Sequence, residues 1–198
     1  KKIKKTSKKI TDNSYNQIIN KLNFKLTNDQ KKSLSDINKD LSSNSKMFRL
    51  LQGDVGSGKT IVALISALSV INSNFQVALM APTEILARQH YTLAKKLFPE
   101  NITIELLSSK SENIDKKRII NELKNNKIKM IFGTHAIFQK KILFNKLGYI
   151  IIDEQHKFGV RQRKLLSDKG GDNCDVLLMS ATPIPRTLTM SVYGDMDV

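Results

Sequence analysis

Residues Gly53–Thr60 read GDVGSGKT, a spacing of residue types that can hold the phosphate groups of a nucleotide. Glycines let such a loop turn its backbone N–H groups toward phosphate oxygens. Lys59 supplies a positive charge for the β- and γ-phosphates, and the Thr60 hydroxyl can ligate Mg²⁺. A glycine- and serine-rich surface turn is the alternative, but the apolar stretch Ile61–Ile71 that follows favours phosphate binding. The sequence therefore predicts a nucleoside triphosphate site made by the phosphate loop, whose residues are Gly53, Asp54, Val55, Gly56, Ser57, Gly58, Lys59 and Thr60.

Two adjacent carboxylates, Asp153 and Glu154, follow a second apolar run at Gly148–Ile152. Side by side at the end of a strand, such a pair can divide the work of hydrolysis. Asp153 would hold Mg²⁺, and Glu154 would orient and deprotonate the attacking water. An ordinary acidic turn is the alternative, and the phosphate loop earlier in the chain argues against it. Lys59, Asp153 and Glu154 are therefore the candidate catalytic residues, and Thr60 and Asp153 are the candidate metal ligands.

The elements that must position these residues alternate along the chain. Strand-like apolar segments lie at Met47–Gln52, Gln76–Ala81, Ile102–Ser108, Lys129–Gly133, Gly148–Asp153 and Cys174–Ser180. Helix-like segments lie at Lys59–Asn72, Thr83–Phe98 and Ser111–Asn125, with weaker ones at Ala136–Asn145 and Arg161–Asp168. Several strands are apolar throughout, as expected when helices cover both faces of a parallel sheet. We therefore expect a three-layer α/β fold whose ligands gather at the carboxyl ends of the strands.

The first part of the chain, residues 1–25, lacks the alternation of strand-like and helix-like segments. Six of the first nine residues are lysine, and residues 1–12 are expected to form a disordered, solvated arm. A short helix is expected around Tyr15–Leu22, and Thr27 with Gln30 fits a capping box ahead of a helix that ends before the loop Ser42–Ser45. The expected division is a basic arm and connecting helix at 1–25 and an ATP-binding lobe at 26–198.

The composition narrows the classes of protein. The formal net charge is +15 over 198 residues, which admits nucleic acid as a partner but does not establish it, because lysine and asparagine abundance also reflects coding bias. Cys174 is the only cysteine, so an internal disulfide is excluded, and no cluster of cysteine and histidine offers a metal cage. With no apolar run of membrane length and no signal peptide, a cytoplasmic protein is expected.

Several blocks of the sequence together resemble the first motor lobe of superfamily 2 helicases. These blocks are FKLTNDQ (Phe24–Gln30), RLLQGDVGSGKT (Arg49–Thr60), APTEILARQHY (Ala81–Tyr91), GTHAIFQ (Gly133–Gln139), IIDEQHKFGVRQR (Ile151–Arg163), SATPIPRTL (Ser180–Leu188) and GDMDV (Gly194–Val198). Within that superfamily the chain most resembles the DEQH-type RecG family of bacterial ATP-dependent DNA helicases, which remodel stalled forks and Holliday junctions. The transcription-repair coupling factor is the main alternative, and Gln155 and Ser57 favour the RecG family.

The resemblance implies a RecA-like lobe that binds ATP and Mg²⁺, and it assigns roles to individual residues. Gln30 would read adenine, although its place in the capping box is an equal alternative. Gln155, His156, Ser180 and Thr182 would couple nucleotide to motor action. Thr83, Gly133, Thr134 and His135 would contact the DNA backbone, which positions a strand without reading its sequence; for Thr83 a helix N-cap is a further role. For Arg88, Arg161, Arg163 and Arg186, DNA binding and a structural role stay open.

The resemblance also implies partners that lie outside these residues: a second helicase lobe with an arginine finger and a fork-binding domain. The chain is therefore expected to be a monomeric motor lobe that binds ATP–Mg²⁺ weakly and barely hydrolyses it alone. Two other functions stay open. One is a nucleic-acid-binding module switched by ATP, against which the intact Glu154 argues. The other is an RNA helicase lobe, since Ser-Ala-Thr after an acidic box recurs there.

Overall fold

The computed structural model describes residues 5–10, 13–108, 112–153, 171 and 173–182. Its centre is a six-stranded, all-parallel sheet in the order β1-β6-β5-β2-β4-β3. The strands are β1 (Phe48–Gln52), β2 (Gln76–Met80), β3 (Ile104–Leu107), β4 (Met130–Gly133), β5 (Leu147–Asp153) and β6 (Asp175–Ser180). The predicted strands are all confirmed, and none of their ends moves by more than two residues.

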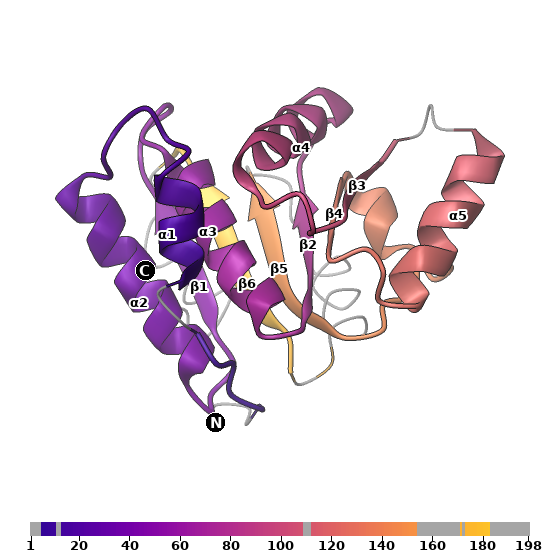
Figure 1. Ribbon diagram of the computed structural model, residues 1–198, viewed down its shortest axis with the longest axis horizontal. Helices are drawn as coiled ribbons and strands as arrows, with labels where there is room; N and C mark the ends of the chain where they lie inside the picture. The colour runs from indigo at the N-terminus through magenta and orange to yellow at the C-terminus, as the bar shows by residue number, and fades with distance from the viewer. Residues whose placement is uncertain (1–4, 11–12, 109–111, 154–170, 172, 183–198) are drawn as a thin grey trace.

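Helices cover both faces of this sheet, which confirms the predicted three-layer α/β fold (Figure 1). The helices are α1 (Asn13–Ile19), α2 (Asn28–Ser42), α3 (Lys59–Asn72), α4 (Glu84–Leu97) and α5 (Asn113–Lys124), with a 3-10 helix η1 at His135–Phe138. One apolar cluster joins α2, α3 and the end of α4 to one face, and a second joins α5 and η1 to the other. The chain thus folds around one sheet with two cores.

Strand β5 shows why the sheet needs both layers. All seven of its residues are buried. Tyr149 and Ile151 belong to the cluster on the α3 side, whereas Ile150 and Ile152 belong to the cluster on the α5 side. Successive side chains of a strand point to opposite faces, so a strand that is apolar throughout must be covered twice. This continuous apolar run is the pattern from which the parallel sheet was predicted.

The weaker helix expected at Ala136–Asn145 is wrong. Only the single turn η1 forms, and its N-cap residue Thr134 makes no capping bond through its side chain. The chain then turns, with the Ile142 N–H donating to the Gln139 carbonyl at 3.0 Å. Phe138 and Ile142 are both buried in the cluster on the α5 side. The burial of these two side chains, rather than a helical repeat in the sequence, determines the course of the backbone here. The helix expected at Arg161–Asp168 lies outside the described residues.

The expectation of a disordered, solvated arm is wrong for residues 5–10. The side chains of Lys5 and Lys8 are both buried and both bond to the carboxylate of Asp175, the first residue of β6. The Lys5 ammonium lies 2.6 Å from Asp175 Oδ2, and the Lys8 ammonium lies 2.5 Å from the same oxygen. The Met47 N–H donates to Asp175 Oδ1 at 2.7 Å. Burial lowers the pKa of Lys5, and its ion pair with Asp175 opposes that shift. Lysines that would be solvated in a disordered tail are part of the fold here, because they pair with the buried carboxylate of Asp175.

The two helices that precede the phosphate loop pack on α3. Helix α1 confirms the short helix expected near Tyr15–Leu22, and its Ile18 is fully buried. Helix α2 begins with the predicted capping box: Thr27 Oγ1 accepts from the Gln30 N–H, and Gln30 Oε1 accepts from the Thr27 N–H. These reciprocal bonds satisfy two of the donors that a helix leaves free at its start.

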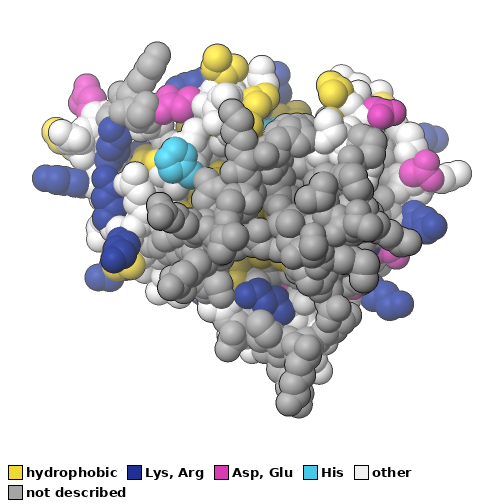
Figure 2. All heavy atoms as spheres, turned by 180° about the vertical axis from the view of Figure 1, so that it is seen from behind, with side chains coloured by type: hydrophobic (Ala, Val, Ile, Leu, Met, Phe, Trp, Pro, Cys, Tyr) yellow, Lys and Arg dark blue, Asp and Glu magenta, His cyan; other side chains and the backbone are white. Residues whose placement is uncertain are grey.

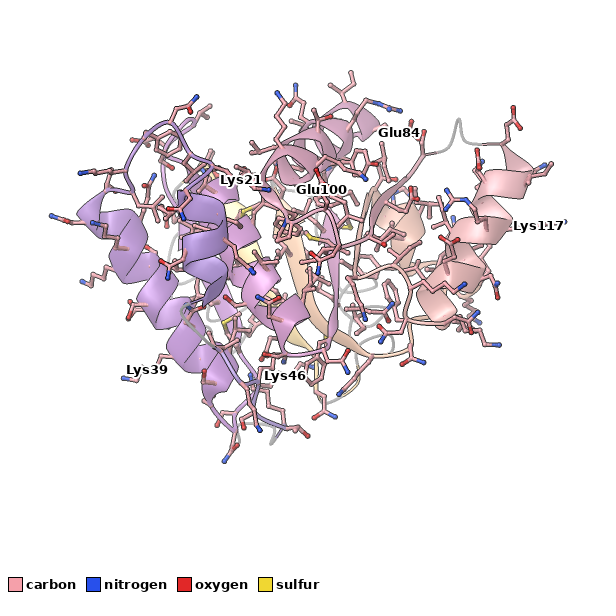
Figure 3. All side chains as sticks on the ribbon, in the orientation of Figure 1. Lys21, Lys39, Lys46, Glu84, Glu100 and Lys117 are labelled. Atoms are coloured by element: carbon pink, nitrogen blue, oxygen red, sulfur yellow. The ribbon has the colours of Figure 1, made fainter. Side chains whose placement is uncertain are left out.

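Basic side chains are spread over the described surface. In Figure 2 the described lysines and arginines of one face are scattered among acidic and neutral side chains. Figure 3 shows Lys39 on α2 and Lys117 on α5 pointing outward from opposite ends of the molecule. On this face the described basic side chains thus form no single patch. None of the described helices is long and apolar enough to cross a membrane.

Candidate nucleotide-binding site

The phosphate loop joins the end of β1 to the start of α3, as its sequence predicted. Gly56 and Gly58 have φ of +82° and +80°, in the left-handed region that glycine favours. Gly58 is the residue before α3, and no side chain caps that helix. The first N–H groups of α3 therefore have no partner within the helix, and the positive end of the helix dipole lies at the loop. This arrangement favours an anion.

Lys59 folds back over the loop from the first position of α3. Its ammonium donates to the carbonyl oxygens of Gly53 at 2.5 Å and of Asp54 at 2.8 Å. An ammonium has three donors, so these two bonds leave one unassigned. The side chain is half-buried. Lys59 thus holds a positive charge directly above the loop without an ion pair to a carboxylate of the described residues.

Gln30 links α2 to the phosphate loop. Besides its capping bond, its side-chain amide donates through Nε2 to the Ser57 carbonyl at 2.8 Å. A Cβ placed on Gly58 would meet this amide and displace it, and the φ of +80° at Gly58 also favours glycine there. The structural alternative for Gln30, the capping box, is confirmed. Its role in reading adenine stays a prediction. The position of its amide beside the loop that would hold the nucleotide is compatible with that role.

The carboxyl ends of β1, β6 and β5 bring the loop and the candidate metal ligand to one edge of the sheet. Gln52 pairs with Ser180, and Met179 pairs with Asp153. The Gly53 N–H donates to the Ser180 carbonyl at 3.3 Å. Neighbouring strands lie about 4.8 Å apart, so Asp153 lies roughly 10 Å from the start of the loop, across a single strand. Thr60 and Asp153 offer a hydroxyl and a carboxylate, the oxygen ligands that Mg²⁺ prefers.

Asp153 is buried, and its carboxylate has a partner that the sequence did not indicate. The Asp153 Oδ2 atom lies 2.6 Å from Nε2 of His90, on α4. The inward side of α4 is formed by Ala87, His90, Ala94 and Leu97. Their spacing of three or four residues is typical of the buried face of a helix. The one polar residue on that face, His90, is therefore a signal that the sequence contains. No local pattern indicated its partner, Asp153, which lies 63 residues further along the chain.

Ser180 and Thr182 lie beside the loop, at the end of β6. Ser180 is fully buried, and its hydroxyl donates to the Thr182 carbonyl at 3.1 Å and accepts from the Thr182 N–H at 3.3 Å. This closes a tight turn immediately after the strand. The other coupling candidates, Gln155 and His156, lie outside the described residues, as do the candidate Glu154 and three of the open arginines, Arg161, Arg163 and Arg186.

The candidate DNA contacts form a second group at the same edge, at the ends of β2 and β4. The Ala81 N–H donates to the Gly133 carbonyl at 2.9 Å, which brings the two strand ends together. Thr83 is the N-cap of α4, because its hydroxyl accepts from the Leu86 N–H at 3.3 Å; the capping role is confirmed. Thr83 and His135 are exposed, Thr134 is half-buried, and Gly133 is buried with no room for a Cβ beside Ile137. Arg88 is exposed on the outer side of α4.

The sheet order therefore separates two groups of candidate residues along one edge. The nucleotide group follows β1, β6 and β5, and the DNA group follows β2 and β4. Strand β5, which ends at Asp153, is the member of the nucleotide group that lies next to β2 of the DNA group. A phosphate loop at the start of this parallel sheet, with a carboxylate two strands away, defines the class of nucleotide-binding P-loop lobes.

Comparisons with known proteins place the chain within that class. The sequence profile of the DEAD/DEAH box helicases matches residues 27–191, and the chain belongs to this family. It is 51% identical over 183 residues to the ATP-dependent DNA helicase RecG of Borreliella burgdorferi, covering 92% of the chain and 26% of the relative. It is 51% identical over 182 residues to RecG of Aquifex aeolicus, covering 91% of the chain and 23% of the relative. The chain thus spans about a quarter of the length of these relatives.

Two solved structures give the same result for the fold. A structure of RecG bound to a three-way DNA junction matches with a TM-score of 0.84 and 41% identity, covering 98% of the chain and 27% of that protein. A DEAD box protein from Methanococcus jannaschii matches with a TM-score of 0.70 and 24% identity, covering 96% of the chain and 53% of that protein. The first match agrees with the resemblance seen in the sequence, and the second supports the fold alone.

Proposed function

We propose that the chain is the nucleotide-binding lobe of an ATP-dependent DNA helicase that acts on branched DNA in recombination and repair. The observation that carries the proposal is the meeting of the phosphate loop and Asp153 at one edge of the sheet. RecG relatives, one of them solved on a three-way DNA junction, supply the substrate class. Because the chain spans only part of those relatives, helicase activity is proposed for a protein of their length.

Within this lobe the residues divide the work of holding ATP. The loop N–H groups and the Lys59 ammonium would bind the phosphate oxygens, where charge-assisted hydrogen bonds are strong. Thr60 and Asp153 would hold Mg²⁺, which when bound neutralises phosphate charge. Glu154 would orient the attacking water and accept its proton. Gln30 would contact adenine while it keeps α2 joined to the loop.

The DNA backbone would lie across the ends of β2 and β4. Thr83, Gly133, Thr134 and His135 would bind phosphate there through short side chains and backbone N–H groups. Gln155, His156, Ser180 and Thr182 would link this contact to the state of the nucleotide. The described residues contain few exposed aromatic side chains, with Phe24 half-exposed, so base stacking would add little and the strand would be held by its backbone.

A second lobe would complete the site with an arginine. Without that lobe, these 198 residues would bind ATP–Mg²⁺ weakly and turn ATP over slowly. We also expect them to be monomeric. The rival function, a module that ATP merely switches, differs in one respect: it does not need Glu154.

The test uses the full-length protein with Glu154→Gln. Turnover stimulated by branched DNA should be abolished while ATP binding stays near that of the unchanged protein. Glu112→Gln, on an exposed residue at the start of α5, is the matched control and should keep both. Translocation that survives Glu154→Gln would refute the motor, and stimulation by RNA instead of branched DNA would refute the substrate class.

A further inference from the structure

The bond between His90 and Asp153 joins a helix that borders the candidate DNA contacts to the candidate metal ligand. The two side-chain atoms lie 2.6 Å apart, and both side chains are about nine-tenths buried. Asp153 is the last residue of β5, and His90 lies in the second turn of α4. Among the described residues, no other side chain is bonded to the Asp153 carboxylate.

His90 lies between small buried residues of its own helix. Ala87 and Ala94 lie one turn before and one turn after it on the inward side of α4, and both are fully buried. These small residues leave room for an imidazole between the helix and the end of the sheet. Figure 1 shows α4 lying across the end of the sheet where β5 terminates. His90 is thus buried, and its Nε2 lies at the carboxylate.

We propose that His90 is a positioning residue for Mg²⁺–ATP: its Nε2–H holds the Asp153 carboxylate in the orientation that binds the metal ion. A carboxylate on the last residue of a strand can rotate about two side-chain bonds, and one of its oxygens is fixed by His90 while the other is left for the metal. Carboxylates that ligate metals are themselves hydrogen-bonded, and loss of that support weakens metal binding. This inference rests on the proposed function of the site.

A purely structural role is the competing explanation, because a buried pair of this kind also fastens α4 to the sheet. The two roles predict different results for variants that keep the packing. In Gln the side-chain amide nitrogen stands near the place of histidine Nε2, whereas in Asn it stands near Nδ1. Because of this difference in donor position, His90→Gln should restore the hydrogen bond and His90→Asn should not. Both replacements are polar amides, so polarity does not distinguish them. His90→Leu keeps much of the volume and removes the donor.

The experiment measures binding of a fluorescent ATP analogue to the 198-residue chain as MgCl₂ is titrated, with far-UV circular dichroism to establish that each variant is folded. Gln89→Ala, on the exposed side of the same helix, is the matched control. In His90→Leu and His90→Asn the Mg²⁺ concentration for half-maximal tightening should rise at least about 10-fold. Binding in EDTA should be unchanged, and His90→Gln and Gln89→Ala should stay within about threefold of the unchanged chain.

Equal Mg²⁺ dependence in His90→Asn and His90→Gln would overturn the inference, since only the donor position distinguishes them. An unchanged Mg²⁺ dependence in His90→Leu would also overturn it. The proposed function fails in another way: the unchanged chain would then bind no nucleotide at any Mg²⁺ concentration.

Discussion

Lys59 in the phosphate loop and the pair Lys5 and Lys8 in the N-terminal arm carry the same ammonium group and differ in everything around it. Lys59 is half-buried and donates to two carbonyl oxygens of its own loop. Lys5 and Lys8 are buried and share the carboxylate of Asp175. A buried carboxylate fixes the arm lysines as parts of the fold, whereas the loop lysine has no carboxylate partner among the described residues.

This difference shows how a positive charge should be interpreted. In the sequence the lysine-rich arm looked like the most solvated part of the chain, and a single lysine after Gly58 looked functional. Charge alone supports neither interpretation: the arm is buried in part, and the function of the loop lysine stays a prediction. What separates the two is the partner: a charge without a carboxylate partner at the start of a helix attracts an anion, and a charge paired with a buried carboxylate does not.

Replacing Asp175 should have the largest effect. Asp175→Asn leaves two buried ammonium groups without a countercharge, and removing one partner of a buried pair destabilises by about 3–5 kcal/mol. The free energy of unfolding, measured in urea, should fall by about that amount. Asp40→Asn, in the partly exposed pair with Arg49, is the control and should lose about 1 kcal/mol or less. Equal losses would mean that burial does not distinguish the arm.

Replacing Lys59 should affect binding rather than stability. Hydrogen bonds to charged groups contribute about 1.5–3 kcal/mol, so Lys59→Ala should weaken binding of a fluorescent ATP analogue about 10- to 100-fold. The urea midpoint should hardly change, because Lys59 bonds only to its own loop within the described residues. Lys39→Ala, on the exposed side of α2, should change neither quantity. A large loss of stability in Lys59→Ala would mean that the loop lysine is structural too.

Cys174 offers a probe of the docked arm. Burial raises the pKa of its thiol to about 12, so almost none of the reactive thiolate exists at pH 8. The arm lies over this strand end: the Lys8 ammonium bonds to the Asn173 carbonyl, and the Thr6 N–H to the Asn173 side chain. Removing residues 1–8 should speed labelling by a thiol reagent about 10-fold, because access and ionisation both increase. The same rate with and without the arm would contradict its docking.

Arg118 is a third case, an exposed cation with carboxylate partners, and should show the smallest effect. It bonds to Glu105 at 3.1 Å and to Glu122 at 2.9 Å, with its side chain 44% exposed. The hydrogen bond to Glu105 and the charge of that residue raise the pKa of Arg118. Exposed ion pairs contribute about 0–1 kcal/mol and are screened by salt. Arg118→Ala should therefore shift the urea midpoint slightly at low salt and not at all in 1 M NaCl; a shift that survives salt would mean that packing dominates.

Most of the fold could be predicted from local pattern. The strands that are apolar throughout, such as β5, indicated a sheet covered on both faces, and α3 has the predicted bounds. The helix expected at Ala136–Asn145 failed because burial of Phe138 and Ile142 in the second core fixed a turn there. The arm failed for a similar reason: its partner, Asp175, lies about 170 residues away.

The candidate site was predictable in residue types and incomplete in contacts. Loop glycines, Lys59 and Asp153 are recognisable because their chemistry requires fixed types at short spacing. His90 was missed because its interaction partner is Asp153, and no local sequence pattern indicates that Asp153 contacts α4. Gln30 lies between these cases, since one of its bonds is local and the other, to Ser57, crosses from α2 to the loop.

The sequence by itself determined the α/β class and the order of the strands along the chain, and it predicted which residues would hold a phosphate. These follow from periodicity and from motifs in which neighbouring residues act together. Only the tertiary structure decided that Lys5 and Lys8 are buried against Asp175 and that His90 holds Asp153. The physical reason is that the free energy of a charge or a hydrogen bond depends on its surroundings, and residues distant in the chain supply those surroundings.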